Sequence, residues 1–318
     1  MESDIHFPTD LNLLYDSGRK VLSFLLKLGE LSGHRQLKSL ERKWKKAYRR
    51  SSEIHRKKGK NYKIRLEKSV AKYLKIAKNL EKKAQATLVE LLGHLDLNSR
   101  TMNLLQAQKP FLDYLTKHID LVERRILKGE VIPHGEKVFS IFEDHVEWIS
   151  KGKAGKTVEF GHRHLVYSDQ YNFVLHQKVL VGQTDKEVAL EEGKRIVANY
   201  GNSYDYTSLS YDRGFYSSLA KQELNKVYEQ VIMPKPGKKT QAQKEEESSD
   251  KYIALRNHHS GVEANINSLE HTGLAKCRNK GLTRFKNYAA LGVIAHNIGN
   301  LGKWLFALEK QAKIKKAA

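Results

Sequence analysis

Apolar residues recur at steps of three and four through residues 10–130, and this spacing most constrains the fold of the chain. The longest series runs from Leu66 to Leu95 on one helical face. Three further stripes have the same spacing and lie at 11–28, 37–48 and 111–126. Such stripes are typical of amphipathic helices that bury their apolar faces against one another. We therefore predict a helical bundle for this part of the chain.

The same part of the chain carries most of the excess positive charge. The 318 residues include 57 Lys and Arg against 36 Asp and Glu, a net charge of +21. Residues 19–83 hold 23 Lys and Arg against 5 Glu, which leaves +18 in this segment. Concentrated charge of this kind indicates a polyanion binder, because each neutralised phosphate releases condensed counterions. A solvated basic helix face is the alternative, and a membrane-surface role is less favoured because one face is not rich in Trp, Phe and Leu.

One crowded run of cations within this segment is predicted to contact the phosphate backbone of DNA. It includes the following side chains: Lys43, Lys45, Lys46, Arg49, Arg50, Arg56, Lys57 and Lys58. Trp44 and Tyr48 are interleaved with them on the apolar stripe, so they are expected to pack inward. Phosphate contacts of this kind provide affinity and register but little choice of base sequence.

Several protein classes are excluded or disfavoured by composition. No run of about 18 apolar residues exists, so no membrane span is predicted. The first ten residues are polar and have no apolar signal-peptide core. A single cysteine, Cys277, excludes an intramolecular disulfide framework and any zinc site with two thiolates. Cys277 lies between Lys and Arg, and we expect it to be exposed. A cytoplasmic protein is the resulting expectation.

The remainder of the chain changes to a mixed pattern of strands and helices. A short strand is predicted at 4–9, and a hairpin is predicted from the β-rich runs 157–167 and 173–181. Further strands are predicted at 207–211 and 231–234, helices at 186–198, 251–270 and 282–310, and a flexible charged loop at 235–250. This order predicts a mixed α/β sheet covered by helices.

Two carboxylates in this mixed region are candidates for chemistry. Asp212 follows the predicted strand 207–211 and opens a turn containing Gly214, where α/β folds place ligands. An ordinary turn aspartate is the alternative for this residue. Glu263 shares a helical face with Arg256 and His259, which forms either a solvated face or the edge of a site. Carboxylates that converge from separate elements can hold two divalent metal ions for phosphoryl transfer, and such oxygen donors suit Mg²⁺.

Six short stretches together resemble bacterial insertion-sequence transposases of the DDE class. In chain order they are ESDIHFPTD with Leu14, IFEDHVEWISKGKAGKTVEFGHRHL, DQYNFVL, SYDRGFYS, RNHHSGVEANINSLEHTGL and FKNYAALGVIAHNIGNL, from residue 2 to about 301. The resemblance implies an α/β ribonuclease H-like fold, a mixed sheet flanked by helices with a large basic all-helical insertion. The implied parts are an incomplete first strand (1–10), the insertion (11–135) and the catalytic domain (136–318).

The resemblance also implies roles for individual residues. Asp212 and Glu263 match the second and third carboxylates of the catalytic and metal-binding triad, with Arg256 and His259 in supporting positions. Glu270 stands where the wider superfamily has a lysine. The first carboxylate of the family precedes the stretch that begins at Glu2, so we expect it to be missing from this chain. The implied cofactor is Mg²⁺ or Mn²⁺. The implied partner is double-stranded DNA, both the terminal repeats and the target DNA, and the resemblance is compatible with a homodimer.

Two functions from different classes follow from these observations. The first is a transposase that cleaves DNA and transfers strands at insertion-sequence ends, acting at the bacterial nucleoid. Because one triad carboxylate is expected to be missing, we expect this polypeptide to be inactive alone. The second is a non-catalytic nucleic-acid-binding protein that acts through residues 19–83.

Overall fold

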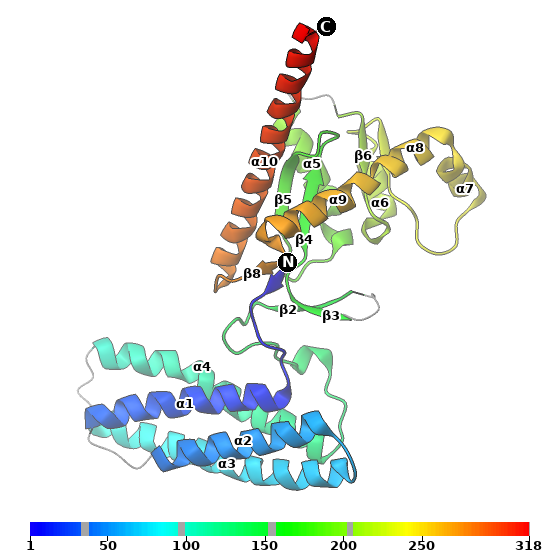
Figure 1. The fold of residues 1–318 in the computed structure, drawn as a ribbon. Helices are drawn as coiled ribbons and strands as arrows, with labels where there is room; N and C mark the ends of the chain where they lie inside the picture. The colour runs from blue at the N-terminus through cyan, green and yellow to red at the C-terminus, as the bar shows by residue number, and fades with distance from the viewer. Residues whose placement is uncertain (33–37, 95–98, 152–156, 202–205, 318) are drawn as a thin grey trace. The chain divides into compact units, whose positions relative to one another are not determined.

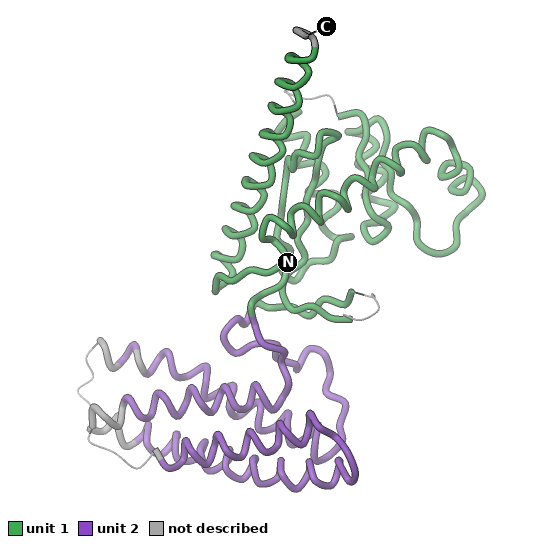
Figure 2. The backbone as a smooth tube through the Cα atoms, viewed as in Figure 1, with its two compact units in different colours: residues 1–4, 145–318 green, residues 5–144 purple. Residues whose placement is uncertain are grey.

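The chain forms two compact units. The computed structural model describes residues 1–32, 38–94, 99–151, 157–201 and 206–317 (Figure 1). Unit 1 comprises residues 1–4 and 145–318, and unit 2 comprises residues 5–144 (Figure 2). The chain therefore passes between the units at residues 4–5 and 144–145, whereas the sequence analysis placed the boundaries after residues 10 and 135.

Unit 2 is a bundle of long helices. They are α1 (Asp10–Ser32), α2 (Lys38–Lys57), α3 (Tyr62–His94) and α4 (Ser99–Val122), followed by a π-helical turn η1 (Glu123–Leu127) and a 3-10 turn η2 (His134–Glu136). The predicted apolar stripes form its core, with Leu14, Val70 and Leu115 completely buried. The helical character predicted for residues 10–130 is confirmed over α1 to α4 and η1, residues 33–37 and 95–98 lie outside the described residues, and Trp44 packs inward as predicted.

A buried histidine makes the stability of this bundle depend on pH. His118 on α4 is completely buried; its Nδ1 donates to the carbonyl of Tyr114 at 2.7 Å, and its Nε2 has no hydrogen-bond partner in the part of the chain that the structure describes. Burial lowers the pKa of His118 to about 4. The neutral ring therefore stabilises the fold fully above the unfolded-state pKa of about 6.5, and this stability is lost as the pH falls from there towards 4.

We expect the free energy of unfolding of unit 2 to fall by about 3 kcal/mol between pH 7 and pH 4 because of this one residue. The measurement is denaturant unfolding, followed by circular dichroism, as a function of pH. A His118→Leu variant carries no titrating ring and is the control, since other groups also titrate in this range. Parallel pH profiles for the two proteins would contradict the assignment.

Unit 1 contains short strands in three hydrogen-bonded groups. The strands are β1 (Glu2–Ser3), β2 (Glu147–Ser150), β3 (Val158–Gly161), β4 (His164–Ser168), β5 (Val174–Val179), β6 (Ser208–Ser210), β7 (Gln230–Ile232) and β8 (Lys276–Cys277). One group has the order β2-β3-β1-β8, with β1 antiparallel to β3 and parallel to β8. The others are the antiparallel hairpin β4-β5 and the parallel pair β6-β7. The unit is therefore mixed α/β.

Helices surround these strands. They are α5 (Asp185–Tyr200), η3 (Arg213–Phe215), α6 (Ser218–Leu224), α7 (Gln241–Ser248), α8 (Asp250–His258), α9 (Ser260–Leu269), η4 (Glu270–Leu274) and α10 (Leu282–Ala317). One face of α5 packs with β4 and β6 around Val188, Leu209 and Leu224. The apolar stripe of α10 is largely exposed, including Leu291 and Ile298. Among the described helices, none combines the length and apolar character needed to cross a bilayer.

Several sequence-based expectations for unit 1 are wrong in detail. The first strand is Glu2–Ser3 rather than 4–9, because its backbone pairs with β3 and β8. The run 157–167 divides into β3 and β4, which belong to different groups. The predicted loop 235–250 contains α7, which begins with a capping box between Thr240 and Gln243. The described strands do not form one sheet, so the ribonuclease H-like arrangement stays a prediction.

Cys277 is completely buried, which corrects the expectation that it is exposed. It lies on β8, which pairs with β1, and Phe285 and Ala289 of α10 belong to the same apolar cluster. Its charged neighbours in the sequence misled the prediction, because alternate residues of a strand point to opposite sides.

Candidate functional site

A concave groove of about 430 Å³ lies between α2 and α3 in unit 2. The chain reverses between these helices at Lys58, Gly59 and Asn61, whose φ angles are 47°, 109° and 56°. Residues three, four and seven apart on each helix then line the groove, because they share a helical face. The lining consists of Arg50, Glu53, Ile54, Lys57, Lys58, Arg65, Lys68, Ser69 and Lys72.

This groove retains a strong positive charge. Its lining includes six cations and a single carboxylate, Glu53, which accepts a hydrogen bond from Lys57 at 2.6 Å. That contact lowers the pKa of Glu53 below its ordinary value. Both partners are more than half exposed, so this pair contributes little stability. Among the described residues, the other five cations form no ion pair.

All eight cations predicted to contact DNA are exposed side chains. Arg50, Lys57 and Lys58 line the groove, whereas the other five lie outside its lining. Arg65, Lys68 and Lys72 of α3 also line it and were not singled out from the sequence. Their spacing of three and four would have placed them on one face, but which face meets α2 is decided by packing. We therefore define the basic groove by the six cations that line it: Arg50, Lys57, Lys58, Arg65, Lys68 and Lys72.

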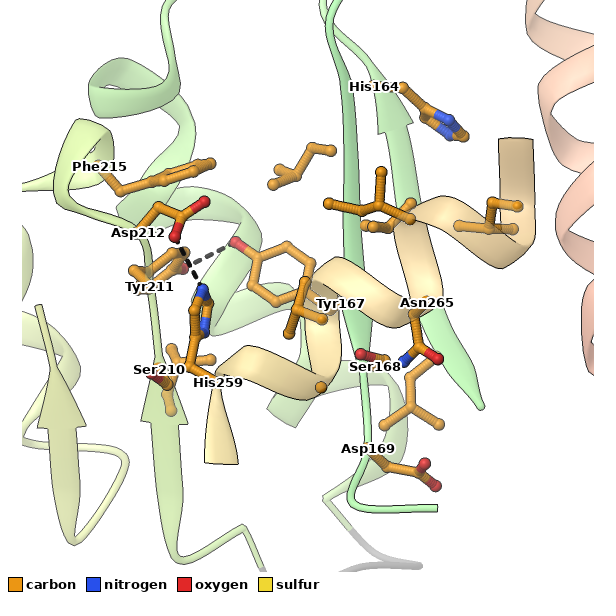
Figure 3. Close-up of a pocket in the computed structure, with 18 of the residues that line it drawn as sticks. His164, Tyr167, Ser168, Asp169, Ser210, Tyr211, Asp212, Phe215, His259 and Asn265 are labelled. Carbon is orange, nitrogen blue, oxygen red and sulfur yellow. Dashed lines mark hydrogen bonds and ion pairs between the residues drawn. The ribbon is translucent and has the colours of Figure 1, made fainter. Parts of the chain in front are cut away.

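Asp212 lies at the end of β6, where the chain leaves the core of unit 1. The preceding Tyr211 is buried, and its ring stacks on Phe215 in the following turn η3. These two rings fix the turn, so the carboxylate of Asp212 projects outward with 72% of its side chain exposed. Asp212 lines a cavity of about 930 Å³, and Figure 3 shows its side chain among other residues of this lining. The predicted placement of a carboxylate at this strand end agrees with the structure.

His259 contacts Asp212 from a different segment of the chain. It lies at the junction of α8 and α9, and its Nε2 is 2.9 Å from Oδ1 of Asp212 (Figure 3). This hydrogen bond lowers the pKa of Asp212 below its ordinary value, and burial opposes the shift. The other ring nitrogen of His259 is buried, and no described residue forms a hydrogen bond with it. The predicted helix 251–270 is therefore interrupted at the residue that contacts the carboxylate.

The structure does not bring the other two predicted site residues to this contact. Arg256 and Glu263 are exposed and do not line the cavity, whereas His259, Val262 and Ile266 do. In the described part of the chain, neither a hydrogen bond nor an ion pair joins Glu263 to Asp212. The helical face that lines the cavity is that of Leu255, Val262 and Ile266, which includes His259, and Arg256 and Glu263 lie outside it.

The described residues do not form a complete metal site. Asp212 offers an exposed carboxylate, the hard oxygen donor that Mg²⁺ or Mn²⁺ prefers, but one of its oxygens already accepts from His259. Within the described ranges, no group of three His, Cys, Asp or Glu side chains is arranged to hold an ion. A two-metal centre would need carboxylates from further segments to join Asp212.

A pair of tyrosines beside Asp212 was missed by the sequence analysis. The hydroxyls of Tyr167 on β4 and Tyr211 are 2.7 Å apart, and Tyr211 also donates to the carbonyl of Ala189 at 2.7 Å. Burial raises the pKa of both phenols, so they stay protonated. No local sequence signal pairs them, because β4 and β6 are far apart in the chain. Asp169, in contrast, caps the hairpin turn by accepting from the backbone N–H groups of Tyr171 and Phe173.

Searches of protein-family models, curated proteins and solved structures return no match for this chain. The assignment of function therefore depends on the geometry and charge of the two sites.

Proposed function

We propose that this chain binds double-stranded DNA through the basic groove of unit 2. The observation that carries the proposal is the surplus of cations in a concave surface: six Lys and Arg side chains against one carboxylate. Flexible, exposed cations on two adjacent helices are suited to phosphate oxygens along a nucleic-acid backbone. Binding of this kind depends on backbone charge and is nearly independent of base sequence. A protein with this function would act at the bacterial nucleoid.

Salt dependence tests this proposal directly. If the six groove cations each neutralise a phosphate, the slope of log K against log salt concentration should be near −5, at roughly −0.9 per contact. The measurement is fluorescence anisotropy of a labelled duplex between about 50 and 200 mM salt. Two duplexes of unrelated sequence should give the same slope. A slope near zero would contradict phosphate binding.

A second proposed function is DNA cleavage and strand transfer of the DDE transposase type. It is supported by the resemblance of the six sequence stretches and by the exposed carboxylate of Asp212 at a strand end. In this proposal Asp212 and Glu263, together with carboxylates from further segments, would bind Mg²⁺ or Mn²⁺, and the ion would supply charge stabilisation to phosphoryl transfer. His259 orients Asp212 through its 2.9 Å hydrogen bond.

Asp212→Asn tests this second function. Any Mg²⁺-dependent cleavage of terminal-repeat DNA should fall by a factor on the order of a thousand, because the neutral amide is a poor metal ligand. Asp169→Asn is the matched control, since an amide oxygen can still accept the two backbone hydrogen bonds of the turn. DNA binding should be unchanged in both variants. Cleavage that survives Asp212→Asn would reject the catalytic assignment.

A further inference from the structure

Helix α10 of unit 1 has two apolar faces. One face packs into the unit, where Phe285, Ala289 and Val293 are buried. The other is a stripe at steps of three and four whose side chains are between 50% and 64% exposed: Leu291, Ile294, Ile298, Leu301, Leu305 and Leu308. At about 100° per residue, the centres of the two faces lie roughly 150° apart around the helix. The stripe therefore points away from the core of unit 1.

The later turns of α10 leave this stripe uncovered by unit 1. Every residue from Leu301 to Ile314 is exposed. Figure 1 shows these turns (red) extending beyond β4 and β5. Trp304 contacts the ring of Tyr171 with centroids 5.5 Å apart, yet 46% of this residue is exposed. Because helices in proteins depend mainly on the packing of an apolar face, this part of α10 is suited to docking on a further surface.

Two aromatic side chains widen the apolar side of these turns. Trp304 and Phe306 are the chain neighbours of Leu305, so they lie about 100° to either side of it. Phe306 is 71% exposed. The seam that joins two helices of a coiled coil is narrower than this, since it uses only two positions of each heptad. Leu, Trp and Phe on one side of a helix are typical of helices that lie at a membrane–water interface.

The remaining side of the same turns is basic. Residues 301–317 contain five Lys and one Glu. Lys303 and Lys310 lie about 140–160° from Leu305 around the helix. Both lysines are exposed, and within the described ranges neither forms an ion pair. A helix with an apolar side and an opposite cationic side is complementary to an anionic surface with an apolar interior, because long lysine side chains reach its charged groups.

A second copy of α10 would suit the spacing of the stripe but not this charge. Paired helices usually gain complementary charges beside their seam, and Glu309 is the only acidic residue in the sequence of α10. A parallel pair would place two copies of 301–317 side by side. An antiparallel pair would place 301–317 beside the turns that contain Arg284 and Lys286. Both arrangements bring basic segments together, so the charge favours an anionic surface over a second copy.

We propose that α10 docks on the surface of an anionic lipid bilayer. The helix lies in the plane of the interface, and Leu301, Leu305 and Leu308 enter the boundary between headgroups and acyl chains. The lysines of the opposite side reach the lipid phosphates. This inference does not rest on the proposed function, because the basic groove belongs to α2 and α3 of unit 2.

Vesicle sedimentation of the full chain, freed of nucleic acid, tests the inference. The probe is a vesicle of phosphatidylglycerol and phosphatidylcholine in equal amounts, and a vesicle of phosphatidylcholine alone is the net-neutral reference. The stripe variant, Leu301→Gln with Leu305→Gln, removes apolar surface, leaves the net charge unchanged and alters only exposed side chains. The matched control is Leu219→Gln with Ile253→Gln, which changes two exposed apolar side chains elsewhere in unit 1.

The parent chain should bind the anionic vesicles, and the stripe variant should bind them more weakly by a factor on the order of a hundred. The control variant should bind like the parent. Binding to the net-neutral vesicles should be weaker for all three chains, because lysines near an anionic surface add to the affinity. Lipids brominated in their acyl chains should quench the fluorescence of Trp304, and Trp304→Phe should remove that quenching.

Equal binding of the stripe variant and the parent would overturn the proposal, since the basic groove alone would then hold the vesicle. A parent chain that does not bind anionic vesicles would also overturn it. A dimer that forms without lipid and that the stripe variant abolishes would assign the stripe to a second copy instead.

Discussion

Replacing Arg50, Lys58, Arg65 and Lys68 with Glu should nearly abolish binding to duplex DNA. These four side chains line the basic groove and have no ion-pair partner among the described residues. We expect the affinity at low salt to fall by a factor on the order of a thousand, and the salt slope to flatten from near −5 to near −2. The fold should be retained, because all four side chains are exposed. Anisotropy titrations and circular dichroism measure the two quantities.

A matched variant separates the groove from charge in general. Lys43, Lys45, Lys46 and Arg49 are exposed cations of α2 that lie outside the groove lining. Changing these four to Glu alters the net charge by the same amount, so long-range attraction falls equally in both variants. We expect the loss of affinity to be much smaller here. Equal losses would mean that DNA follows the whole basic surface, as predicted from the sequence, rather than the groove.

Replacing Trp44 with Ala should destabilise unit 2 by about 3–5 kcal/mol. The indole is 1% exposed, its ring lies 4.8 Å from that of Tyr73, and its Nε1 donates to the carbonyl of Tyr15 at 3.1 Å. Removing it leaves a large cavity and deletes this hydrogen bond between α2 and α1. Chemical denaturation followed by circular dichroism measures the change.

Two further variants make this prediction specific. Trp304→Ala on α10 is the control, since that indole is 46% exposed and its loss should change stability by less than about 0.5 kcal/mol. Gly18→Ala should also destabilise the bundle, because an added Cβ would lie only 2.2 Å from the Trp44 ring. A Trp44→Ala protein as stable as the parent would show that the indole does not hold α1, α2 and α3 together.

The helices of unit 2 could be predicted well because their information is local. Leu66, Val70 and Tyr73 follow the helical period, and each is buried in the bundle core. The same reasoning was less successful between Lys251 and Glu270, where periodicity predicts one helix and the structure breaks it at His259. The contact between His259 and Asp212 is tertiary, and no spacing within a single helix can reveal it.

The residues of the candidate sites also divide into those that a local sequence pattern predicts and those that depend on tertiary packing. Asp212 was found from the sequence because a hydrophobic strand followed by a Gly-containing turn is a local pattern. Glu263 was placed with it by the resemblance and by helical spacing, but only His259 reaches Asp212 in the structure. Arg65, Lys68 and Lys72 belong to the groove because α3 turns that face towards α2, which depends on the packing of α1 and α4 behind them.

The sequence by itself determined where helices form in unit 2, the concentration of positive charge on them and the position of a carboxylate at a strand end. These features depend on residues a few positions apart, whose side chains share a face whatever the rest of the chain does. Only the tertiary structure decided which cations line a groove and which residue meets Asp212. Those features depend on segments far apart in the chain, and the free energy of burying their apolar faces together selects one arrangement.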